Sequence, residues 1–353
     1  MGSLEAKWIE ASRTWHVSDE LLDYLNLSMT VTFHGVLSLT GVVTNIVNMV
    51  FFFKLKLKTS MSVGLMALSF TDFWVTAFQL TSCCCFLVKV VYPDCPVDPW
   101  TLGGYVFSWA HYLGYLISCW ITTMLSVERC FCVVAPFTVR QLFTKARCAY
   151  TLIIIYSAHA LIHAPTFYYA EWVSVGQAAN SNFSVLKVVF NDNSAKWEIL
   201  ADLVAGVGLS LVSQIVIFVC TARMIVSLRS TSKIRHNPES STKVNNLQGE
   251  CVVKTVNETL SPRERRLVRT ILCLAVIVSV CNIPRLIATA FRHLAPRANL
   301  GAYQNLQILL WEVSYIFMTI SCSLNMFVYL KLNSGFQKLF KGYLISCTLC
   351  DQK

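Results

Sequence analysis

Seven separate apolar stretches, each long enough to cross a lipid bilayer, constrain this chain more than any other feature. They lie at about 29–53, 61–88, 103–134, 148–170, 199–228, 266–291 and 305–330. A helix needs about 20 apolar residues to span the hydrocarbon core. Only 14% of the residues are charged, whereas a soluble domain has about 25%. The sequence therefore predicts an all-α membrane protein with a seven-helix bundle over 29–332.

Lys and Arg in the connecting segments predict the orientation of this bundle. With the C-terminus inside, the inner segments hold 21 of these residues and the outer segments hold 7. Positive charge gathers on the inner side of a membrane, so we expect an extracellular N-terminal tail (1–28) on a multi-pass plasma-membrane protein. The same bias accounts for the net charge of +10 without a nucleic-acid partner.

The segments outside the spans differ in composition. The longest inner segment, about 230–263, is rich in Ser, Lys, Asn and Glu and is predicted to be a flexible loop. In the tail (333–353), apolar residues recur at helical spacing opposite two lysines, which predicts a short amphipathic helix on the inner membrane surface. The apolar residues are Phe336, Leu339, Phe340, Tyr343 and Leu344, and the lysines are Lys338 and Lys341.

Two N-x-S/T sequons, at Asn26 and Asn182, fall on outer segments and predict glycosylation. Most of the 15 cysteines lie in spans or on the inner side, where thiols stay reduced. Cys95, on an outer loop, is a candidate disulfide partner for the triplet at 83–85, and buried free thiols are the alternative. Cys347 and Cys350 are candidates for palmitoylation or are free thiols.

Asp72 lies in the middle of the second span. A carboxylate at bilayer depth indicates a functional site and needs partners. Candidates at similar depth are Asn45, Ser118, Ser321 and Asn325. Oxygen ligands around one carboxylate favour a sodium ion, and the alternative is a hydrogen-bonded cluster that only holds helices together.

The inner end of the third span carries Glu128-Arg129-Cys130. Glu264, at the inner end of the sixth span, is twenty residues before Pro284, which places it at the depth of Arg129. An ion pair between the two would hold the third and sixth helices together, whereas a solvated Glu264 paired locally is the alternative. Pro284 interrupts its helix and predicts a kink that acts either as a lever or as a static bend.

Two helical stripes indicate a cavity in the outer half of the bundle. His111 and Tyr115 begin a stripe on the third span, and Trp311 and Tyr315 begin one on the seventh. We expect these four side chains to contact a ligand. Arg285 is an unusual charge in the sixth span, with Asp202 or Glu312 as its nearest partners by depth. It predicts either capture of an anionic ligand or a buried pair with Glu312 that fixes two helices.

No enzyme motif is present. The sequence has no metal-ligand spacing of His and Cys, no phosphate-binding glycine loop and no nucleophile elbow. We therefore expect no enzymatic activity, no organic cofactor and no metal other than sodium.

The seven spans occur together with Asn45, Asp72, Glu128-Arg129-Cys130, Pro284 and the run NMFVY that ends at Tyr329. This combination resembles the rhodopsin-like (class A) G-protein-coupled receptors over about 30–345. The resemblance implies an outer ligand cavity, a sodium site at Asp72 and an Arg129 lock that opens to admit a heterotrimeric G protein. The run from Glu128 to Phe137 looks like that of invertebrate peptide and chemosensory receptors.

Several positions depart from the family pattern. Cys130 stands where Tyr is usual, Asn282 where Trp is usual, and Met326 where Pro is usual. Gly104 stands where the family has a disulfide cysteine, and the second outer loop has no cysteine. The seventh span has no lysine for a Schiff base, which excludes an opsin. His111 stands where an aminergic receptor needs Asp.

The leading hypothesis is a receptor that transmits binding of an extracellular peptide or small chemical to a G protein. One alternative is a seven-span transporter, with Asp72 as coupling carboxylate and Arg285 as substrate contact. The other is a decoy receptor that binds ligand without signalling.

Overall fold

The computed structural model describes 18–57, 59–92, 95–135, 139, 141–168, 170–176, 184–190, 192–236, 262–294, 300–333 and 335–342. Seven helices in these ranges are long and apolar enough to cross a membrane, which confirms the predicted spans. They are Tyr24–Lys54, Ser60–Val91, Pro99–Val134, Lys145–Tyr168, Ala195–Ser227, Glu264–Leu294 and Tyr303–Leu332.

Three of the spans contain wider π-helical turns. The first combines α2 (Asp19–Ser28), η1 (Met29–Gly35) and α3 (Val36–Lys54), and the second is α4 (Ser60–Val91). The third combines α5 (Pro99–Thr101), η2 (Leu102–Phe107) and α6 (Ser108–Val134), and the fourth is α8 (Lys145–Tyr168). The fifth combines α9 (Asp192–Ala201), η3 (Asp202–Leu209) and α10 (Ser210–His236). The sixth is α11 (Pro262–Leu294), and the seventh is α12 (Leu300–Ser323) with α13 (Asn325–Leu332).

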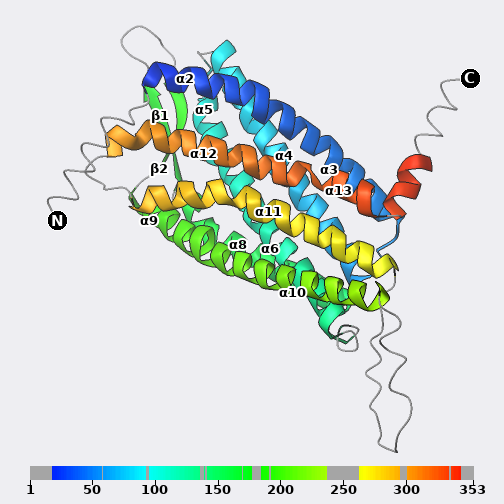
Figure 1. The fold of residues 1–353 in the computed structure, drawn as a ribbon. Helices are drawn as coiled ribbons and strands as arrows, with labels where there is room; N and C mark the ends of the chain where they lie inside the picture. The colour runs from blue at the N-terminus through cyan, green and yellow to red at the C-terminus, as the bar shows by residue number, and fades with distance from the viewer. Residues whose placement is uncertain are drawn as a thin grey trace, which may run out of the picture.

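The helices lie side by side as one elongated bundle with two distinct ends (Figure 1). We call the end that carries α2, α5 and α9 the hairpin end, and the end that carries Arg129 and residues 335–342 the tail end. The predicted loop at 230–263 begins later than expected, because α10 continues to His236.

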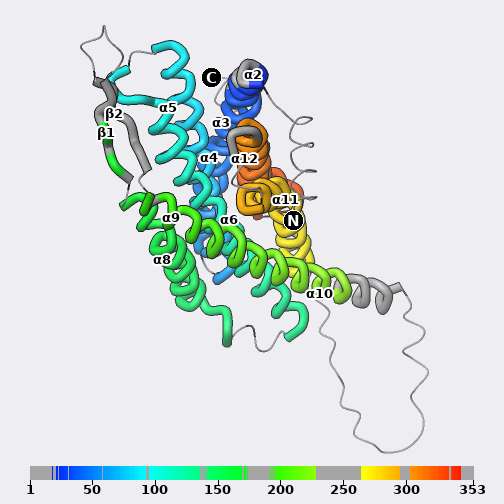
Figure 2. Tube along the Cα trace, turned by 90° about the vertical axis from the view of Figure 1, so that its left-hand side faces the viewer, coloured from blue at the N-terminus to red at the C-terminus, as the bar shows by residue number. Residues whose placement is uncertain are grey.

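One β-hairpin adds to the predicted all-α architecture. β1 (Ala170–Gly176) pairs antiparallel with β2 (Ser184–Phe190), and Ala170 lies opposite Phe190. Valine recurs in both strands, and β-branched residues favour extended structure. β2 contacts η2 and α9, so the hairpin lies to one side of this end of the bundle (Figure 2).

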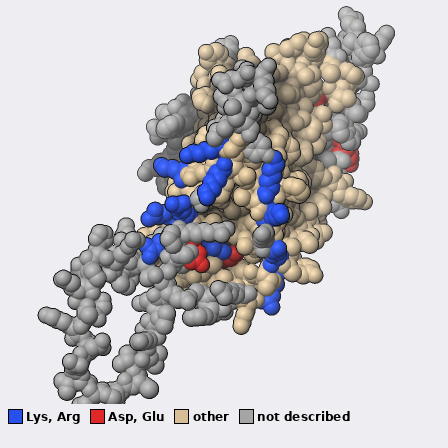
Figure 3. Space-filling model, turned by 90° about the vertical axis from the view of Figure 1, so that its right-hand side faces the viewer, with Lys and Arg blue, Asp and Glu red and all other residues tan. Residues whose placement is uncertain are grey.

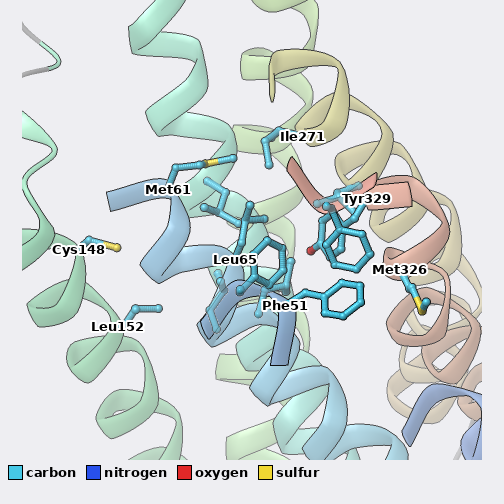
Figure 4. Packing of buried hydrophobic residues seen from close by; sticks show 14 of the residues in the cluster. Phe51, Met61, Leu65, Cys148, Leu152, Ile271, Met326 and Tyr329 are labelled. Atoms are coloured by element: carbon cyan, nitrogen blue, oxygen red, sulfur yellow. The ribbon is translucent and has the colours of Figure 1, made fainter. Parts of the chain in front are cut away.

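Close packing holds the tail half of the bundle together. Phe51, Leu65, Ile271 and Tyr329 come from four different helices and belong to one buried cluster (Figure 4). The helix at 335–342, which fits the predicted amphipathic helix, inserts Phe336 into the same cluster. The rings of Phe51 and Phe336 lie 4.8 Å apart in an edge arrangement that favours aromatic pairs.

Gly41 lets α3 approach its neighbours closely. A Cβ at this position would lie within 3.0 Å of Thr76 and Ser323, both buried. Gly41→Ala should therefore lower the stability of the bundle by about 1–3 kcal/mol through overpacking. The measurement is the thermal unfolding midpoint in detergent. Gly104→Ala is the matched control, because a Cβ there meets nothing within 4 Å; equal midpoints for the two variants would contradict the packing argument.

Candidate functional site

Asp72 lies at the centre of the bundle with its carboxylate fully buried. It accepts hydrogen bonds from the Ser118 hydroxyl (2.7 Å) and from the Asn325 amide (2.5 Å). Two of the four predicted partners are thus in direct contact with it. These hydrogen bonds join α4, α6 and α13. Asn325 is the first residue of α13, immediately after the helix breaks at Leu324.

The other two predicted partners lie farther along the network. Asn45 donates to the carbonyl oxygens of Gly41 (2.9 Å) and Cys322 (3.0 Å). Ser321 is buried, and it makes no hydrogen bond to Asp72 in the part of the chain that the structure describes. The described residues contain no group of three His, Cys, Asp or Glu residues that could hold a metal ion. A cation here would therefore be held by one carboxylate with hydroxyl and carbonyl oxygens, which suits sodium.

Arg129 pairs with the adjacent Glu128 at the tail end. Its guanidinium lies 2.6 Å from Glu128 Oε1, and Ser60 donates to the other carboxylate oxygen (3.1 Å). Both charged residues are buried. The predicted pair of Arg129 with Glu264 stays a prediction.

A cavity of about 620 Å³ opens beside Arg129. Its charged lining residues are one acid, Glu264, and four bases, Lys56, Arg129, Arg266 and Lys338. The excess of basic side chains makes this opening electropositive. Tyr329 lies behind the cavity in the core, where its ring packs against Phe52 at 5.1 Å.

Another cavity, of about 270 Å³, opens at the hairpin end. We call it the aromatic cavity, and its lining includes Trp109, Tyr112, Glu198, Arg292, Trp311 and Tyr315. Glu198 and Arg292 form an ion pair across it. The structure thus places two of the predicted ligand contacts, Trp311 and Tyr315, on its wall.

His111, Tyr115 and Arg285 lie beneath this wall. All three are buried, and they line neither this cavity nor the smaller one beside it. His111 packs edge-on against Tyr315 at 5.3 Å, and its Nδ1 lies 3.0 Å from the Val75 carbonyl oxygen. This layer supports the residues that line the aromatic cavity, and ligand contact by either group stays a prediction.

Arg285 donates to Asn282 Oδ1 (2.7 Å), the Gly206 carbonyl (2.8 Å) and the Tyr112 hydroxyl (3.3 Å). Tyr112 in turn donates to Asp202 Oδ1 (2.7 Å). Asp202, one of the two partners expected from depth, is therefore connected to Arg285 by hydrogen bonds through the Tyr112 hydroxyl. The Asn282 bond crosses Pro284, which ties the side chain of Arg285 to the helix segment before the proline.

The predicted pair of Arg285 with Glu312 is wrong, because Glu312 faces the opposite side of the bundle. Its Oε2 lies 3.0 Å from Nε2 of His34, in η1. His34 is not among the residues predicted from the sequence. A histidine within the first apolar span was the available signal, since ionisable residues in spans usually have a partner.

Two predicted modifications also fail. Cys95 and the cysteines at 83–85 are all free thiols. The loop is held to α4 instead by the ion pair between Lys89 and Asp98 (3.3 Å). Asn26 lies within α2 with only 7% of its surface exposed, which leaves no room for a glycan. Asn182, Cys347 and Cys350 lie outside the described residues.

Comparison with known proteins agrees with this arrangement. A family model described as 7 transmembrane receptor (rhodopsin family) matches residues 45–329. The trissin receptor of Drosophila melanogaster is 25% identical over 121 residues, which cover 33% of this chain and 17% of that protein. This similarity supports the resemblance to invertebrate peptide receptors.

Proposed function

The chain belongs to the rhodopsin family of seven-transmembrane receptors, and we propose that it binds an extracellular peptide and activates a heterotrimeric G protein. The observation that carries this proposal is the pair of openings at opposite ends of one bundle. The aromatic cavity opens at the hairpin end, and the cavity beside Arg129 opens at the tail end. A receptor that transmits a signal across a membrane needs a ligand site and a partner site separated in this way.

We propose that the hairpin end faces outside the cell. Lys and Arg side chains gather on the tail end (Figure 3), as expected for the inner face of a membrane. The N-terminal tail and the hairpin would then be extracellular. An electropositive inner cavity suits a partner segment with a negative helix C-terminus or carboxylate.

A peptide ligand is supported by the trissin receptor similarity and by the lining of the aromatic cavity. Aromatic walls with one acid and one base offer contacts to both side chains and backbone of a peptide. Ligand binding would shift the position of α11 relative to α6 and α12, with Pro284 as the bend, and widen the inner cavity.

The direct test is nucleotide exchange on a panel of purified G proteins. Membranes that contain the receptor are exposed separately to peptide pools and to small-metabolite pools, and receptor-free membranes are the control. We expect exchange with a peptide fraction. Exchange with small metabolites alone would overturn the peptide assignment, and saturable binding without exchange would indicate a non-signalling receptor.

We also propose that Asp72 and Ser118 take part in holding a sodium ion that favours the inactive bundle. Both groups present oxygen atoms, and Asp72 has no ion-pair partner among the described residues. Bound sodium would neutralise the buried carboxylate and join α4 to α6. Asn45 and Ser321 would act as outer supports of the same site.

Asp72→Asn should abolish the dependence of agonist affinity on sodium, because the amide carries no charge to attract the ion. The measurement is agonist competition in sodium chloride against N-methylglucamine chloride at equal ionic strength. In the wild type we expect sodium to weaken agonist binding by about fivefold, the lower end of typical allosteric coupling. Sodium dependence that persists in Asp72→Asn would place the ion elsewhere.

A further inference from the structure

A second cavity at the hairpin end lies on the side of the bundle where the first, second, third and seventh spans meet. It measures about 90 Å³, and its polar lining includes Asn26, His34, Gln79 and Glu312. We call it the acceptor cavity. Tyr315 lines both this cavity and the aromatic cavity, so a ligand in one can extend toward the other.

Two side chains of this lining carry hydrogen-bond acceptors without donors among the described residues. Oδ1 of Asn26 and Oε1 of Gln79 are buried and have no hydrogen-bond partner in the described part of the chain. The two side chains are only 7% and 4% exposed. A buried acceptor left without a donor costs about 1–3 kcal/mol, so such groups usually mark the position of a missing partner.

The orientation of Gln79 follows from its neighbour. Its Nε2 lies 2.9 Å from Nδ1 of His34, and an amide nitrogen can only donate. The Nδ1 atom is therefore the acceptor in this bond, and the ring carries its proton on Nε2, on the side of Glu312. This arrangement uses the donor of Gln79 within the protein and leaves its carbonyl oxygen for another group.

The cavity has a negative charge and no lining base to offset it. Glu312 is the acidic side chain in its lining, and no Lys or Arg lines it. The Glu312 carboxylate retains accepting capacity, because His34 approaches only one of its oxygens. The lining thus combines one carboxylate with two amide side chains whose oxygen atoms have no donor among the residues that the structure describes.

We propose that the acceptor cavity binds a positively charged group of the ligand, a guanidinium or a primary ammonium. Such a group carries three to five N–H donors, which match the free acceptors, and a charge that matches Glu312. A cavity of about 10–15 Å³ holds one water molecule, so 90 Å³ admits a cationic head group of several heavy atoms. The inference rests on the proposed receptor function and adds the chemistry of one part of the ligand.

Reaction of Cys83 tests the charge selectivity of the cavity without a known ligand. Cys83 lines the cavity, and the adjacent Cys84 is exposed and serves as internal control. The full-length receptor in detergent is treated with the cationic aminoethyl or the anionic sulfonatoethyl methanethiosulfonate, and mass spectrometry follows each thiol. We expect the cationic-to-anionic rate ratio to be about tenfold higher at Cys83, which corresponds to about 1.4 kcal/mol.

Glu312→Gln should remove this difference while leaving the thermal midpoint of the receptor unchanged. Equal ratios at the two thiols in the wild type would overturn the proposal.

A pair of probe peptides tests binding itself. N-acetyl-Tyr-Arg-amide and its citrulline counterpart have nearly the same shape, but only the first is charged. By saturation-transfer NMR we expect the arginine probe to bind about tenfold more tightly. Glu312→Gln should abolish this preference, and Asp192→Asn should retain it, because Asp192 is exposed on α9 and lines neither cavity. Equal binding of both probes to the wild type would refute the cation site.

These measurements need no G protein, so the two proposals fail separately. Charge preference without nucleotide exchange would retain the cation site and remove the signalling function. Exchange without charge preference would retain the receptor and remove the cation site.

Discussion

Arg285→Leu should destabilise the receptor by about 1–3 kcal/mol for each buried acceptor that loses its donor, namely Asn282 Oδ1 and the Gly206 carbonyl oxygen. The Arg285 side chain is fully buried, and two of its three hydrogen bonds join α11 to α6 and η3. Its removal leaves the Asp202 carboxylate, which is 1% exposed, with contacts to Tyr112 and to His293 Nε2 (3.0 Å). The measurement is thermal unfolding of the purified receptor in detergent.

Arg292→Leu is the matched control on the same helix. The side chains of Arg292 and Glu198 are 24% and 17% exposed, so water can solvate Glu198 when its partner is lost. We expect a loss of about 1 kcal/mol or less. Arg285→Leu combined with Asp202→Asn should recover part of the stability lost by the single variant, because both buried charges are then absent. A single variant as stable as the control would show that the network contributes no net stability.

Arg129→Ala should reduce ligand-stimulated nucleotide exchange at least about tenfold, which corresponds to about 1.4 kcal/mol of lost stabilisation. Arg129 is the buried base beside the tail-end cavity, where we propose that the G protein binds. Arg223→Ala is the control, since Arg223 is exposed on α10 and does not line that cavity. Exchange must be measured at equal receptor amounts on the membrane. Equal exchange in both variants would remove Arg129 from the coupling site.

The partner of Arg129 should control basal exchange in the opposite direction. Glu128→Gln removes the charge that holds Arg129 at 2.6 Å, so exchange without ligand should rise several-fold as the open bundle becomes more populated. Glu264→Ala tests the pair predicted from the sequence, because Glu264 lines the same cavity. A rise in only one variant identifies the acid that restrains Arg129. No rise in either would refute the lock.

The sequence predicted those parts of the site that depend only on the position of a residue along its helix. The stripe from His111 through Ser118 to Arg129 is buried throughout, as its spacing of three or four residues predicted. Ser118 and Asn325 both contact Asp72, since groups at equal depth on inward faces converge. Depth in the membrane gave the wrong partner for Glu312, because depth does not determine which neighbouring helix a side chain faces.

The amino-acid sequence by itself determined the seven spans and their alternating direction. A segment crosses the bilayer when it is apolar over a sufficient length, and charged residues remain outside the hydrocarbon core. Both the length and the charge are local properties of the chain. Only the tertiary structure decided which side chains meet: Arg285 with Tyr112, Glu312 with His34, and Asn26 inside a cavity. These contacts depend on the rotation and spacing of whole helices, which packing of small residues such as Gly41 sets across the bundle.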